Sequence, residues 1–116
     1  MILTVWQIRR RINRLSKLAK KELNSGSTGF QNLVEVLCTS DPKTYPYEAW
    51  LAIRIAASSK LPERYTANNA MQEMHRTMKA SSSVESFNAL KEMIEIRAER
   101  DFITASMKVQ IERSKK

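Results

Sequence analysis

Turn-forming residues are scarce in this chain, which has only two glycines and three prolines among its 116 residues. A β-sheet needs frequent tight turns, and these turns depend on glycine, proline and a few small polar residues. Long helices joined by short loops need far fewer of them. The scarcity therefore predicts an all-α fold, a single-domain bundle of a few long helices.

Length and composition set further bounds. With 42% hydrophobic and 28% charged residues, residues 1–116 have the composition of one globular domain. Cys38 is the single cysteine, so no internal disulfide can form, and this suits a reducing compartment. No apolar run approaches the ~20 residues of a membrane span, and the first residues do not follow the pattern of a signal peptide. We therefore expect a cytoplasmic, intracellular protein.

Apolar periodicity and capping residues predict about five helices. Thr4 is the expected N-cap of the first helix, and Thr28 with Gln31 forms an expected capping box before the second. Pro46 and Pro62 suit the first turns of the third and fourth helices. The predicted ranges are 4–23, 29–39, 46–59, 62–80 and 84–113, of which the last is the longest.

The expected core follows from the apolar positions of these helices. The helix at 46–59 is apolar nearly all round, which predicts that it lies at the centre with the others packed around it. Ser82 with Glu85 is a second expected capping box, before the last helix. The fourth and fifth helices have the expected apolar lines Ala67, Met71, Met74 and Met78, and Phe87, Leu90, Ile94, Ala98, Phe102, Ala105 and Val109.

The first helix carries most of the net charge of +8. Residues 1–23 contain seven basic residues and one acidic residue, Glu22. The apolar residues Val5, Ile8, Ile12, Leu15, Ala19 and Leu23 recur at steps of three or four and define one face. The opposite face carries the proposed binding residues Trp6, Arg10, Arg14, Lys17 and Lys21.

Such a basic stripe predicts an anionic partner. Lysine and arginine along one helix face can neutralise successive phosphates, and the indole of Trp6 can stack on an exposed base. Nucleic acid is therefore the leading partner of what we expect to be a non-catalytic binding protein, with DNA and RNA equally open. The plain alternative is a solvated helix face. A membrane-surface helix is disfavoured because the apolar face is needed for the core.

A second functional hypothesis is an accessory or inhibitor protein, of the kind encoded by phages and plasmids. Such a protein would cover an acidic surface, or a nucleic-acid-binding cleft, of a larger protein by presenting similar positive charge. This hypothesis rests on analogy with other small basic proteins. The oligomeric state stays open.

The segment joining the third and fourth helices has some features of a helix-turn-helix. A short joint around Lys60 would place polar residues of the fourth helix where they could contact phosphates and base edges. Lys60 stands where a glycine usually makes the turn, which weakens this interpretation. The secondary candidate surface consists of Arg64, Asn68, Asn69, Gln72 and Arg76.

Catalytic motifs are not evident. The sequence has one histidine, His75, and no glycine-rich phosphate loop, Cys-x-x-Cys pair or serine-elbow motif. A Cys–His pair would require Cys38 and His75 to meet, although Cys38 lies on the apolar side of its helix. We therefore expect no catalytic residues, no metal site and no cofactor.

Overall fold

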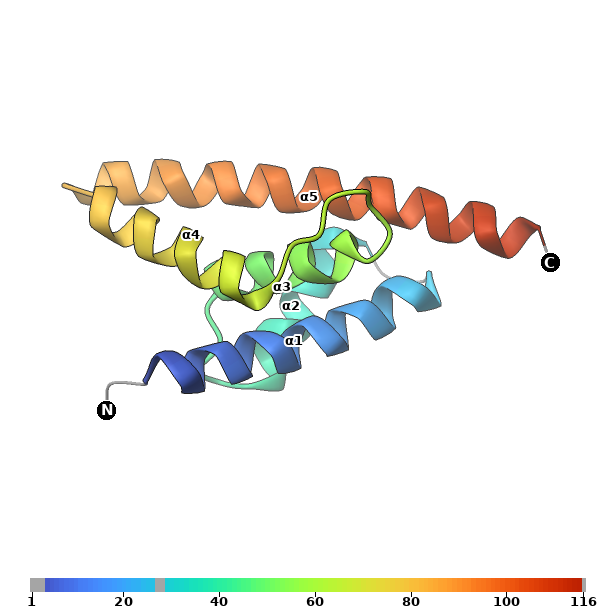
Figure 1. Ribbon diagram of the computed structural model, residues 1–116, viewed down its shortest axis with the longest axis horizontal. Coiled ribbons are helices and arrows are strands. Elements are labelled where there is room, and N and C mark those ends of the chain that lie inside the picture. Colours follow the sequence, from blue (N-terminus) through green and yellow to red (C-terminus); the bar gives the residue numbers. More distant parts are fainter. Residues whose placement is uncertain (1–3, 27–28, 116) are drawn as a thin grey trace.

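The computed structural model describes residues 4–26 and 29–115, and every regular element in these ranges is an α-helix. Figure 1 shows α1 and α5 along opposite sides of the molecule, with the shorter helices between them. The molecule measures 49 × 25 × 23 Å, and α5 runs along nearly all of the longest axis. The predicted all-α class and long C-terminal helix are confirmed. The helices are α1 (Val5–Ser25), α2 (Phe30–Ser40), α3 (Pro46–Ser58), α4 (Ala67–Ala80) and α5 (Val84–Ser114).

Both ends of α1 are closed by specific caps. The Thr4 side chain accepts from the backbone N–H of Gln7, and the Gln7 side chain accepts from the backbone N–H of Thr4, which forms a full capping box. At the other end Gly26 has φ 69°, a left-handed conformation that favours glycine. The Arg113 side chain of α5 donates to the Asn24 carbonyl at 2.6 Å. This contact ties the end of α5 to the end of α1.

The start of α4 and the caps of α2 and α5 differ from the predictions. α4 begins at Ala67 instead of Pro62, because Thr66 and Asn69 form a capping box that fixes the start. α5 is capped by Ser83, which accepts from the N–H of Ser86, so the expected box of Ser82 and Glu85 is not the one used. The N-cap of α2 is Gly29, without a side-chain cap bond, and Thr28 lies outside the described residues.

The third helix lies at the centre, as its composition predicts. Nine of its 13 residues are buried, and it packs against all four other helices. One apolar cluster joins α3 to α1, α2 and α5, and a second joins it to α1, α4 and α5. Trp50 packs against both clusters. α3 therefore holds the bundle together and fixes the orientation of α1.

The predicted apolar lines are correct for most positions. In α5 the five positions from Ile94 to Val109 are buried, whereas Phe87 and Leu90 are half-buried. In α4 Met71 and Met74 pack at the edge of the second cluster, but Met78 is 64% exposed. The correction at Met78 has a simple cause, because Thr77 takes the buried position in that last turn of α4.

Candidate anion-binding surface

The packing of α1 directs most of its basic side chains into solvent. Ile12, Leu15, Ala19 and Leu23 are buried against the other helices, so the opposite face of α1 points outward. All five predicted residues on that face are exposed. They are Trp6, Arg10, Arg14, Lys17 and Lys21.

A surface hollow of about 730 Å³ lies beside this face and collects most of the predicted residues. Lys21 is one turn further along α1, outside the hollow. Lys43, from the loop between α2 and α3, adds a positive charge that the sequence analysis did not include. We call this feature the Trp6 hollow. Its lining is Trp6, Gln7, Arg10, Arg11, Asn13, Arg14, Lys17, Asp41 and Lys43.

Two arginines of α1 are already paired with carboxylates. Arg14 donates to Asp41 at 2.8 Å, across the Trp6 hollow. The backbone N–H of Lys43 also donates to Asp41, and this bond is the main reason why the pKa of that carboxyl lies below its usual value. Arg11 pairs with Glu48 at 2.7 Å in a nearly buried contact. Arg11 is therefore held against α3 at the base of the Trp6 hollow, and part of the Arg14 charge is neutralised.

The remaining basic residues of the face keep their full charge. Arg10, Lys17 and Lys21 are exposed and have no ion pair within residues 4–26 and 29–115. The Arg10 guanidinium carbon lies 4.8 Å from the centroid of the Trp6 ring, and Trp6 is itself 60% exposed. The pair therefore presents a positive charge stacked on a flat apolar surface.

Four of the five secondary candidate residues are exposed on α4, and Arg64 lies outside this helix. Arg64 lies in the connection before α4 and lines a second hollow together with Lys20 of α1. Gln72 and Arg76 lie against Val5 in a third hollow, between the start of α1 and α4. The last two residues, Asn68 and Asn69, are exposed on the first turn of α4, and the Asn69 side chain is used in the cap.

The connection between α3 and α4 does not have helix-turn-helix geometry. Eight residues, 59–66, separate the two helices, whereas the motif uses a turn of three or four. Since α4 begins only at Ala67, Arg64 does not lie on it at all. The helix-turn-helix interpretation is therefore wrong for this chain.

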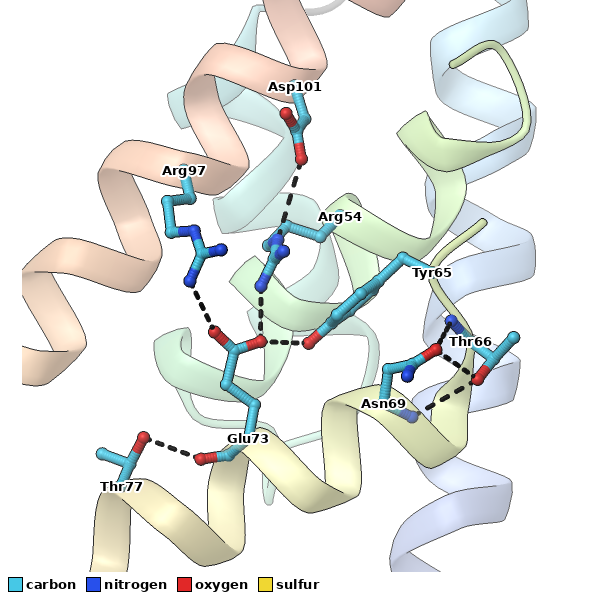
Figure 2. A network of polar contacts seen from close by, with 8 residues as sticks. All are labelled: Arg54, Tyr65, Thr66, Asn69, Glu73, Thr77, Arg97 and Asp101. Carbon is cyan, nitrogen blue, oxygen red and sulfur yellow. Dashed lines mark hydrogen bonds and ion pairs between the residues drawn. The ribbon is translucent and has the colours of Figure 1, made fainter. Parts of the chain in front are cut away.

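A buried polar network joins α3, α4 and α5, and the sequence analysis missed it (Figure 2). The Glu73 carboxylate accepts from Arg54 and from the hydroxyl of Tyr65, and Arg97 donates to its other oxygen at 3.4 Å. The Arg54 guanidinium also stacks on the Tyr65 ring at 4.0 Å, and its Nε lies 3.7 Å from Asp101. Because Arg54 and Glu73 neutralise each other's charge, the network stabilises the packing of α4 against α3 and α5.

The one feature of the sequence that could have predicted this network is the charge of Arg54. A lone arginine within the apolar run 49–57 must find an acidic partner if the helix is buried. The sequence does not show which acid supplies it, because Glu73 is 19 residues away on another helix. Only the packing of α4 against α3 brings the two groups together.

The network predicts a specific response to alkaline pH. Burial, and then the hydrogen bond to Glu73, raise the pKa of Tyr65 above its ordinary value of 10.0. The neutral Tyr65 side chain therefore contributes fully to the free energy of unfolding below pH 10, and this contribution decreases as the pH rises above 10. We expect Tyr65→Phe to reduce the dependence of the unfolding free energy on pH in this range, as measured by urea melts. An unchanged dependence would contradict the buried position of the hydroxyl.

Cys38 and His75 are the two remaining candidate groups from the sequence. Burial, with a smaller effect of Glu48, raises the pKa of the Cys38 thiol, which disfavours the reactive thiolate. His75 is exposed on α4. Within the part of the chain that the structure describes, no three His, Cys, Asp or Glu side chains come together as a potential metal site.

Among the described residues, no helix is both long and apolar enough to cross a bilayer.

Comparison with protein-family models, with curated proteins and with solved structures finds no match to this chain.

Proposed function

We propose that this protein is a non-catalytic binding protein that contacts nucleic acid through the basic face of α1. The observation that carries the proposal is the row of exposed, unpaired cations Arg10, Lys17 and Lys21 beside the Trp6 hollow. At a rise of ~1.5 Å per residue, Lys17 lies about 10.5 Å along the helix axis from Arg10, and Lys21 lies about 6 Å beyond Lys17, so the row can follow phosphates along a strand. Lys43 widens the positive surface beyond α1.

The exposed indole gives the surface a second means of contact. Trp6 lies at one end of the basic row, with Arg10 against its ring. An unpaired base can stack on such a ring, and stacking of this kind is tolerant of sequence. Because phosphate contacts position a strand without specifying its bases, we expect binding with little sequence preference. We also expect single strands to bind at least as well as duplexes.

The test compares two variants that lose the same charge from different faces. In the first, Arg10, Lys17 and Lys21 are replaced by glutamine. In the control, Lys79, Lys108 and Lys115, which are exposed on other parts of the surface, are replaced in the same way. Binding to labelled single-stranded and duplex DNA and RNA is measured by fluorescence anisotropy over a range of salt.

We expect the α1 variant to lose most of its affinity, while the control keeps most of it. With three fewer phosphate contacts, the slope of log affinity against log salt should become shallower by about 3. Both variants should remain folded, because none of the six side chains is buried. Equal binding by wild type and the α1 variant would place the site elsewhere. If wild type does not bind at low salt, the acidic surface of a protein partner becomes the better proposal.

A further inference from the structure

The helix α5 has two apolar faces, and only one of them is used in the fold. Ile94, Ala98, Phe102, Ala105 and Val109 are buried against the bundle. A second set of large apolar residues on the same helix is exposed, each to between 50% and 58%. This outer stripe consists of Met93, Ile96, Ile103, Met107 and Ile111.

The spacing of the outer stripe is that of a coiled-coil seam. Its residues follow one another at steps of three or four once Arg100, which completes the series, is included. At about 100° per residue they share a narrow arc directly opposite the buried line. Figure 1 shows α5 along one edge of the bundle, and every apolar residue of the stripe is at least 50% exposed. A contiguous exposed row of this kind marks an interaction surface.

The charges of α5 are divided between its two halves. Residues 84–99 contain four acidic and two basic residues, whereas residues 100–115 contain two acidic and four basic ones. The two halves therefore carry net charges of −2 and +2. An antiparallel copy of the same helix would set each acidic half against a basic half, whereas a parallel copy would set like charges together.

Arg100 also favours the antiparallel arrangement. In a parallel pair, Arg100 would face the Arg100 of the second copy within the apolar seam, which is unfavourable. In an antiparallel pair centred between residues 101 and 102, Arg100 lies opposite Ile103 and Ile96 lies opposite Met107. The arginine can then extend its charged end past the seam into solvent.

We propose that the outer stripe of α5 is a homodimer interface, in which two copies of this chain pair their α5 helices antiparallel. This surface is separate from the basic face of α1, which lies on the other side of the molecule (Figure 1). The dimer therefore does not depend on the proposed nucleic-acid binding. Each function can be tested while the other is left intact.

The experiment uses two variants of the full chain, Ile96→Glu and Met107→Lys, with Gln31→Glu on the exposed face of α2 as a control. Sedimentation velocity over a range of micromolar concentrations gives the mass of each species. Wild type and the control should approach twice the monomer mass of 13.4 kDa. Each α5 variant alone should dimerise at least about 100-fold more weakly, because a charge is set into the seam without a partner. Circular dichroism confirms that all variants remain helical.

Mixing the two α5 variants tests the orientation. In the antiparallel pair, the new carboxylate at position 96 faces the new ammonium at position 107, so the mixture should recover a mixed dimer. In a parallel pair these groups do not meet, and the mixture would stay monomeric. A monomeric wild type at the highest concentration would overturn the proposal. Dimers that persist in either variant alone would overturn it too, and a mixture that fails to recover would overturn the antiparallel arrangement.

Discussion

Replacement of Glu73 by alanine is expected to lower the free energy of unfolding by about 3–5 kcal/mol, the range for loss of one partner from a buried ion pair. The Arg54 and Glu73 side chains are only 10% and 13% exposed. Without the Glu73 carboxylate, Asp101 at 3.7 Å would be the remaining anionic partner of Arg54, and the hydroxyl of Tyr65 would lose its acceptor. Helix propensity does not cause the loss, since alanine is the best helix former. Denaturant melts followed by circular dichroism measure the effect.

Two further variants separate this mechanism from a general loss of charge. Glu63→Ala removes an exposed carboxylate from the connection before α4 and should change stability by no more than about 0.5 kcal/mol. The double variant Arg54→Met with Glu73→Met removes both charges together, so it should cost less than the sum of its single changes. Additive costs would show that the two groups do not depend on each other.

Truncation of Ile53 is expected to cost about 2–5 kcal/mol, because its side chain is 1% exposed and a cavity would remain in the centre of α3. Trp50→Ala should also be costly, since this ring packs against both apolar clusters. Trp6→Ala removes an equally large ring from an exposed position and should cost about 0.5 kcal/mol. Urea melts of the three variants give the comparison. Equal costs for the two tryptophans would contradict the orientation of α1.

Local signals in the sequence predict a large part of this fold. Thr4 and Pro46 mark the starts of α1 and α3 correctly, and the buried line of α5 follows from its periodicity. Pro62 misled the prediction of α4, because a proline also suits a loop, and the pair of Thr66 and Asn69 is the cap that the chain uses. Such errors arise where two local signals compete within a few residues.

The exposed face of α1 could be predicted because its charge and its apolar positions have the same helical period. The positive charge that Lys43 adds to the Trp6 hollow could not be predicted, because it depends on how the loop between α2 and α3 folds back onto α1. The same holds for the neutralisation of Arg14 by Asp41, 27 residues away. Periodicity describes one helix at a time, whereas these contacts depend on the placement of several helices. The second apolar stripe of α5 has the same helical period as the buried line, so periodicity alone does not distinguish which of the two faces the core.

Small side chains make up a large share of the buried residues in the described chain, and this limits the mutations that the protein can accept. Nine of the buried residues in the described chain are alanines, and seven of them lie in the larger cluster, where α3 meets its neighbours. Truncation of a buried alanine removes only one methyl group, whereas a larger side chain at the same position has no space in the packed core. Added methyl groups would therefore force the helices apart. Selection should therefore act mainly against substitutions that replace a buried alanine by a larger residue. A leucine-rich bundle of the same size would instead be limited by changes that create cavities.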